Sequence, residues 1–195
     1  METSTREMSP PKRASAMPPE ERRAAIIEAV RPLLAEHGEA ITTKQIACAA
    51  GIAEGTIFRV FADKDELLDA TLDAALDQET FEATLRAIDP DLPFEQQLVE
   101  ATVLIQRRVV DVWTLLSHLG PKRHDQVRHP MTDSPALAEI FATHADRIRI
   151  EPTVAARHLR ALTLSLTHPM IAAEAAEASD IVDTVLHGIG TGPST

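Results

Sequence analysis

Hydrophobic and polar positions follow a helical period along most of this chain. The clearest stretch lies between residues 94 and 119, where inward positions recur at alternating steps of four and three: Leu98, Thr102, Ile105, Val109, Val112, Leu116 and Leu119. Positions with this spacing share one face of an α-helix. The pattern predicts a long, central and largely buried helix from about Phe94 to Leu119. No segment alternates with period two for long enough to predict a sheet, so we expect an all-α fold.

Prolines and capping residues delimit the other long helices. We expect these helices over about 19–38, 63–88, 135–150, 152–174 and 178–188. Pro32 should kink the first helix, Asp89-Pro90 should end the second, and Ser134-Pro135 is a favourable start for the third. His168-Pro169 interrupts the fourth. The polar residues 120–134 contain two prolines and predict the longest loop.

Residues 38–68 predict two short helices joined by a tight turn. Thr43 is a plausible N-cap for the first, and Gly51 stands where a left-handed residue must end it. The second is expected over about 54–61. Inward positions in the two helices are Ile46, Ala47, Ala50, Ile57 and Phe61. With the first long helix as a brace, this arrangement is typical of a helix-turn-helix, whose second helix enters the major groove of DNA.

The same segment closely resembles the DNA-binding head of the tetracycline-repressor family of bacterial regulators. The matching residues agree in order and spacing without a gap: Thr42, Thr43, Ile46, Ala47, Ala50, Gly51, Ile52, Gly55, Thr56, Ile57, Phe58, Phe61 and Lys64 to Leu68. The resemblance implies a homodimer that binds a palindromic operator. It also implies a helical body that binds a small-molecule effector and dimerises through its last two helices.

The resemblance assigns roles in DNA binding to eight residues: Thr42, Thr43, Lys44, Gly55, Thr56, Phe58, Arg59 and Lys64. Thr43 and the start of its helix would bind phosphate, and Arg59 would read guanine or bind phosphate. Lys44 and Lys64 are expected to contact phosphates. Gly55 permits close approach to the DNA, and Thr56 can bond a phosphate or a base edge.

Three positions depart from the family pattern. Phe58 stands where tyrosine is common, Ala53 replaces a frequent serine cap, and Val60 occupies a position that is often polar. Each change removes a hydrogen-bonding group but none forbids the binding mode. Glu54 cannot bind phosphate, although it could accept a hydrogen bond from a cytosine amino group.

Charge and composition limit the other classes of function. Residues 1–62 hold equal numbers of basic and acidic residues, so the net charge of −11 belongs to the rest of the chain. DNA contacts must therefore come from the N-terminal part. A single cysteine, Cys48, no apolar signal segment and no long apolar stretch point to a cytoplasmic protein without a membrane span. We expect Cys48 to pack as a small apolar residue, with a thiol sensor as the alternative.

The residues predict neither an enzyme nor a metal or cofactor site. Phosphate-binding glycine loops and nucleophile motifs are absent from the sequence. His118, His124 and His129 gather around the long loop without the spacing of a helical metal site. The leading alternative to a DNA-binding regulator is a helical protein-interaction module whose head does not bind DNA.

The expected division is a disordered arm over 1–18, a helix-turn-helix domain over 19–68, a ligand-binding and dimerisation domain over 69–190 and a flexible tail over 191–195. Candidate effector contacts are Arg108, Trp113, His118, Phe141 and Met170, with plain packing as the alternative for each. Residues expected to line the dimer-forming helices are Val154, Ala155, Leu159, Leu162, Leu166, Ile181, Val182, Val185, Leu186 and Ile189, with intramolecular packing as the alternative. Repression is expected rather than activation.

Overall fold

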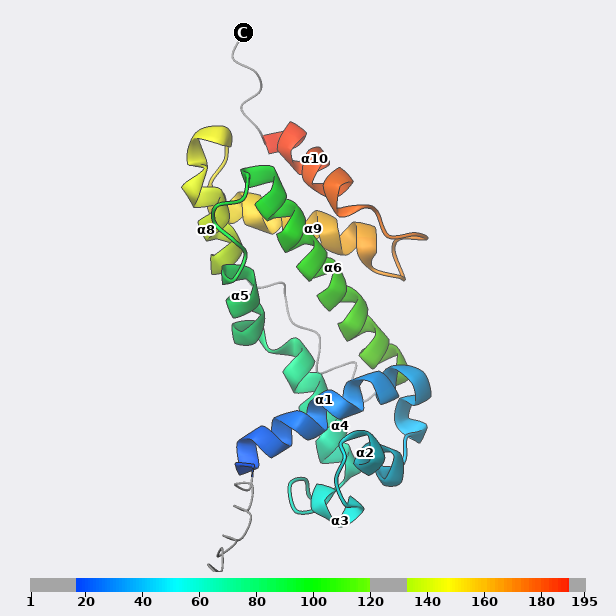
Figure 1. Ribbon diagram of the computed structural model, residues 1–195. Helices are drawn as coiled ribbons and strands as arrows, with labels where there is room; N and C mark the ends of the chain where they lie inside the picture. The colour runs from blue at the N-terminus through cyan, green and yellow to red at the C-terminus, as the bar shows by residue number, and fades with distance from the viewer. Residues whose placement is uncertain (1–16, 120–132, 190–195) are drawn as a thin grey trace, which may run out of the picture.

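A computed structural model describes residues 17–119 and 133–189, and within those ranges the regular structure is helical, as the sequence predicts. Figure 1 shows an elongated molecule with a small head at one end and a larger body at the other. The head contains α1 (Pro19–His37), α2 (Thr43–Ala49), α3 (Glu54–Ile57) and α4 (Lys64–Leu76). The body contains α5 (Gln78–Arg86), α6 (Phe94–His118), α8 (Pro135–Thr143), α9 (Pro152–Thr167) and α10 (Ala178–Ile189). Short 3-10 turns follow α1 and α8, as η1 (Gly38–Ala40) and η3 (Ala145–Arg147).

The helix α6 contributes to two separate hydrophobic cores. Its first half packs in the body core through Phe94, Leu98, Ala101 and Ile105, against α8, α9 and α10. Its last turns pack in the head core through Leu115 and Leu116, followed by Leu119, against α1 and α4. The long stripe predicted from the sequence is therefore one helix whose two halves are buried in different places. Figure 1 shows α6 in green running from the body down to the head.

Two glycines adopt the left-handed backbone that ends a helix. Gly51 has φ +63° after α2, as predicted. Gly38 has φ +59° and ψ −149° after α1, and a Cβ at this position would lie 3.3 Å from the carbonyl oxygen of His118. Both the conformation and this close approach to the end of α6 favour glycine at residue 38.

The predicted helix over 63–88 is in fact two helices, because the helical conformation is interrupted at Asp77. The Asp77 carboxylate accepts hydrogen bonds from the backbone N–H groups of Glu79 (3.3 Å) and Thr80 (3.0 Å), and so caps the start of α5. These bonds lower the pKa of Asp77, the contacts with Thr80 being the largest cause. The expected domain boundary after residue 68 falls inside α4, whose later residues Leu72 and Ala75 still belong to the head core.

Three other helices are shorter than predicted. The helix expected to reach residue 150 ends at Thr143, where His144 leaves the helical conformation and its ring lies 3.1 Å from the carbonyl oxygen of Ile140. The helix expected to reach residue 174 ends at Thr167, because a residue before proline disfavours the helical region and His168 is extended. The helix expected over 54–61 covers Glu54–Ile57 and continues as turns. Most of the predicted arm, most of the long loop and the tail lie outside the described residues.

Candidate nucleic-acid interface

The start of α2 is held by a capping box centred on Thr42. The Thr42 hydroxyl accepts from the backbone N–H of Gln45 (3.2 Å), while the Gln45 side-chain oxygen accepts from the backbone N–H of Thr42 (2.9 Å). Thr43, predicted as the N-cap, is instead the first residue of the helix, and its hydroxyl donates to the Glu54 carboxylate of α3. The spacing of Thr42 and Gln45 is the usual signal for a capping box, and it was readable in the sequence.

The helix α3 has one buried side and one exposed side. Ile57, with no exposed surface, and Phe61, only 1% exposed, lie in the head core. Gly55 in α3, and Phe58 and Arg59 in the turn that follows it, are exposed, and Phe58 is 51% accessible. Figure 1 shows α3 at the end of the molecule farthest from the body. A large apolar ring at such a position is available to contact a partner such as DNA.

Packing within the protein does not require glycine at residue 55. A Cβ added to Gly55 would meet no atom within 4 Å, and the residue lies in ordinary helical backbone rather than in the left-handed region. The absence of a side chain here leaves room for close approach of another molecule, such as a DNA backbone. Thr56 is half-buried beside it.

The basic residues predicted to contact DNA differ in their surroundings. Lys44 at the start of α2 and Arg59 after α3 are both exposed. Lys64, the first residue of α4, donates to the backbone carbonyl of Glu39 in η1 and so braces that turn. An ammonium group has three donors, so this contact leaves Lys64 able to bind an anion as well.

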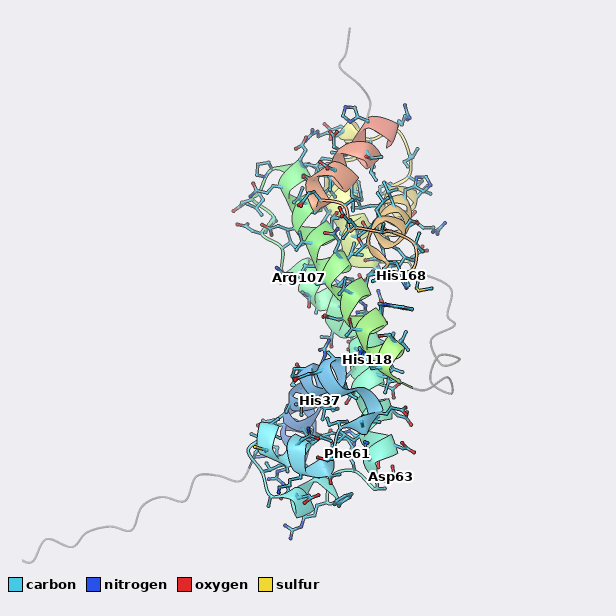
Figure 2. All side chains as sticks on the ribbon, turned by 90° about the vertical axis from the view of Figure 1, so that its right-hand side faces the viewer. His37, Phe61, Asp63, Arg107, His118 and His168 are labelled. Carbon is cyan, nitrogen blue, oxygen red and sulfur yellow. The ribbon has the colours of Figure 1, made fainter. Side chains whose placement is uncertain are left out.

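The turn after α3 is fastened to α1 by Arg23. Its guanidinium lies over the Phe61 ring, 4.4 Å from the ring centre, and donates to the carbonyl oxygen of Val60 (3.4 Å) and the carboxylate of Glu66 (3.4 Å). Glu66 also accepts from the backbone N–H of Ala62 (2.6 Å). These bonds keep α3 in a defined position on the head, and helical periodicity alone does not predict them. Figure 2 shows Phe61 at the centre of the head.

Cys48 does not pack in the head core, contrary to expectation. Its side chain is exposed, because the inner face of the seven-residue helix α2 is taken by Ile46 and Ala47. Ala50, at the turn that follows, also packs against the head core. The predicted environment of this thiol was therefore wrong.

The five candidate effector contacts lie in different parts of the molecule. Phe141 is fully buried in the body core and meets Phe94 edge-on, with ring centres 5.8 Å apart. Trp113 packs against His168, and Met170 is 72% exposed in the segment after α9. His118 lies at the end of α6 next to the head, as Figure 2 shows. The structure brings only Trp113 and the segment around Met170 near each other.

Arg108 is held at the break between α4 and α5. Its guanidinium donates to the carbonyl oxygens of Leu76 (2.7 Å) and Asp77 (2.9 Å) and lies over the Phe81 ring, 4.4 Å from its centre. Burial is the first cause that lowers the pKa of Arg108, and the nearby Arg160 adds to it. Arg108 thus satisfies carbonyl groups left open at the end of α4.

Surface hollows lie elsewhere in the body and at its junction with the head. One hollow of about 580 Å³ is formed by α9, α10 and the residues before α9, and it is lined by Arg149, Ile150, His158, Ala161, Leu162, Ser165, Thr184, Val185 and Gly188. A second, of about 350 Å³, lies between α8 and the start of α9. A third, of about 450 Å³, lies between α1 and α6. The linings of these three hollows include none of the five candidate effector contacts.

Many residues expected on the dimer-forming face pack inside the subunit. Ala155 and Leu159 of α9 and Ile181, Val182 and Val185 of α10 are buried in the body core. Those five contacts follow the intramolecular alternative. Leu162, Leu166 and Leu186 are partly buried against the same core, and Val154 is also partly buried. The structure does not describe the side chain of Ile189.

Within residues 17–119 and 133–189, no group of three or more histidine, cysteine, aspartate or glutamate side chains is arranged to hold a metal ion. Over the same described ranges, none of the helices combines the length and apolar character needed to cross a bilayer.

Comparison with known proteins agrees with this geometry. The model of bacterial regulatory proteins of the tetR family matches residues 26–71, from the middle of α1 into α4. A structure described as a TetR-family transcriptional regulator from Mesorhizobium loti is similar to this chain at 17% identity, with a TM-score of 0.61, covering 90% of this chain and 100% of the other. A TetR transcriptional regulator from Streptomyces coelicolor is similar at 22% identity and TM-score 0.58, covering 86% and 98%. NalD, the secondary repressor of the MexAB-OprM multidrug efflux pump in Pseudomonas aeruginosa, is similar at 24% identity and TM-score 0.51, covering 90% and 98%.

Proposed function

We propose that this protein is a DNA-binding regulator of the tetR family and acts as a homodimeric repressor of transcription. Support comes from the match of residues 26–71 to the tetR family model and from the similarity of the fold to solved TetR-family regulators. Each head reads one half of a palindromic operator. The observation that carries the proposal is the position of α3 at the outer end of the head, with Gly55 exposed in the helix and Phe58 and Arg59 exposed in the turn that follows it. NalD, a repressor with the same fold, supports repression rather than activation.

The proposed contacts divide between phosphates and bases. Thr42, Thr43 and Lys44 at the start of α2, with Lys64 at the start of α4, bind phosphates. Thr43 does so through its backbone N–H, because its hydroxyl donates to Glu54. On α3 and the turn after it, Gly55 allows the backbone to approach, and Thr56 and Arg59 reach toward base edges or phosphates. Phe58 supplies apolar contact in place of a hydroxyl group. The acidic body, which carries the net negative charge, keeps non-specific attraction to DNA weak.

The proposal is tested first by fluorescence anisotropy with DNA from just upstream of the protein's own coding region. We expect tight binding to this duplex, weaker binding to a scrambled one, and a loss of affinity as salt rises. Arg59→Ala should weaken specific binding by about 5-fold or more, whereas Arg86→Ala, an equal loss of charge on α5 in the body, should leave it unchanged. A failure to bind any sequence from a random pool at low salt would support the interaction-module alternative instead.

Dimerisation is proposed through the outer faces of α9 and α10. Support comes from the hollow between them, where apolar Ile150, Ala161 and Leu162 are flanked by polar groups such as His158. An isologous pairing of two helices from each subunit would form a four-helix interface. Ala161→Arg should convert the dimer to a monomer in sedimentation equilibrium, while Ala87→Arg, at an exposed position after α5, should not. A dimer that tolerates Ala161→Arg would contradict this interface.

Effector binding in the body is proposed as the means of regulation. A small molecule that binds better to one spacing of the two heads would shift the dimer toward that state. Of the five candidate contacts, Trp113 and Met170 lie in one neighbourhood near His168, whereas Arg108 and Phe141 already have packing roles. The cytoplasm is the proposed location, since the operator is there.

A further inference from the structure

We infer that Glu54 reads a cytosine in each half of the operator, by accepting a hydrogen bond from the exocyclic amino group of that base. This inference rests on the proposed function. Glu54 is the first residue of α3, is exposed, and directly precedes Gly55. In a helix-turn-helix the first residues of the second helix are the ones that meet base edges. The position therefore puts a carboxylate where sequence is read.

The chemistry of a carboxylate restricts what Glu54 can contact on DNA. Its oxygens only accept hydrogen bonds, so phosphate oxygens and the acceptor atoms of guanine repel it. In the major groove the remaining donors are the amino groups of cytosine and adenine. The adenine amino group stands beside the acceptor N7, which disfavours a carboxylate, whereas cytosine presents its amino group without that neighbour. Cytosine is accordingly the base that a carboxylate selects.

A second helix holds the Glu54 side chain in place. The hydroxyl of Thr43, the first residue of α2, donates to Oε1 of Glu54 across the turn between the two helices. None of the described residues donates a hydrogen bond to Oε2, so this oxygen remains able to accept from a base. The hydrogen bond from Thr43 restricts the Glu54 side chain before DNA binds, which lowers the rotamer entropy lost on binding. Thr43 therefore serves as a positioning residue for Glu54.

A carboxylate at this interface also weakens binding to the wrong sequence. Every non-cognate duplex places phosphates and base acceptors near Glu54 without a matching donor, and an unmatched charge of this kind is a recognised means of discrimination. Replacing Glu54 by a neutral residue should thus raise affinity for non-specific DNA while lowering selectivity at one base pair. A residue with a purely structural role would change affinity for all sequences alike.

The test is a selection of bound duplexes from a random pool by the full-length protein and its variants. Wild type should favour a C·G pair at one position in each half-site by about 5- to 100-fold over the other pairs. Glu54→Ala should lose that preference alone, and Glu54→Gln should move it to adenine, the usual base for a glutamine side chain. Thr43→Val should reduce the preference at the same position.

The matched control is Glu36→Gln, the same change at an exposed carboxylate in the last turn of α1. Figure 2 shows the neighbouring residue, His37, at the end of the head that faces the body. The control should select the wild-type sequence. If Glu54→Ala and Glu54→Gln also selected an unchanged sequence, the inference would be overturned while the proposed function stood. If wild type enriched no sequence at all, both would be overturned.

Discussion

Arg108 offers the most direct test of how the body holds the end of the head. It lies on α6 and binds the two carbonyl oxygens at the end of α4, those of Leu76 and Asp77, at 2.7 and 2.9 Å. A hydrogen bond made by a charged group contributes about 1.5–3 kcal/mol to the free energy of unfolding. The contribution is full when water cannot reach the partner that is left after the bond is lost. Asp77 is exposed, so water replaces part of the lost bonding in a variant. The contact with the Phe81 ring adds about 0.5–1 kcal/mol.

Arg108→Ala should therefore lower the free energy of unfolding by about 2–3 kcal/mol. For a chain of this size that loss corresponds to a fall in Tm of about 4–12 °C. Arg108→Lys should recover part of the loss, because an ammonium group can bind one carbonyl but lacks the planar pair of donors. Arg107→Ala, at the exposed neighbouring position, is the control and should change stability by no more than about 0.5 kcal/mol.

Thermal and urea unfolding, followed by circular dichroism, measure these differences on all three variants under identical conditions. The reasoning would be refuted if Arg108→Ala were as stable as Arg107→Ala. It would also be refuted if Arg108→Lys kept the full stability of the wild type. In that case the packing of the aliphatic part of the side chain, and not its hydrogen bonds, would carry the effect.

Three further predictions concern single residues in the head and at the break. Gly38→Ala should lower the free energy of unfolding by about 1–3 kcal/mol, because alanine is strained at φ +59° and its Cβ would crowd the carbonyl of His118. Urea unfolding measures this loss, and an unchanged midpoint would contradict it. Thr42→Ala should cost about 1 kcal/mol and speed amide exchange in α2, with Thr42→Ser as the control that keeps the cap. The pKa of Asp77 is lowered in the folded protein. The ionised carboxylate should therefore stabilise the fold fully at pH values above its ordinary pKa of 3.8, and this stabilisation should be lost as the pH falls through the lower pKa of the folded protein. The stability gap between wild type and Asp77→Asn should close over that acidic range, and a gap that is the same at pH 7 and in acid would oppose the argument.

The extent of agreement between sequence and structure follows from how each helix ends. Gly38 and Gly51 are strong stop signals, since few other residues tolerate their backbone, and both helix ends were predicted correctly. Asp77 is a weaker signal: apolar spacing continues on both sides of it, and only its side-chain capping of Glu79 and Thr80 shows that a new helix begins. The spacing of apolar residues therefore does not predict the break between the two helices.

In the candidate interface, the family pattern identified the segment but not its internal contacts. The exposed side of α3 follows from burial of Ile57 and Phe61 at helical spacing, which the sequence reveals. The hydrogen bond between Thr43 and Glu54 joins residues of different helices, and the Arg23 contacts join residues far apart in the chain. Neither can be deduced from local spacing, because each depends on how the helices cross. The spread of the effector candidates has the same cause.

The division of α6 between two cores bears on how such proteins could be recombined. A helix of 25 residues is about 37 Å long, and here its final turns belong to the head even though the chain reaches them only after the body has begun. A chimera that joins this head to a foreign body at residue 77 would leave Leu34 and Leu72 without Leu115, Leu116 and Leu119, and a junction at residue 68 would remove Leu72 as well. The transplantable unit is therefore discontinuous. An exchange of the proposed DNA specificity between two proteins of this fold should graft the last two turns of α6 together with residues 19–76.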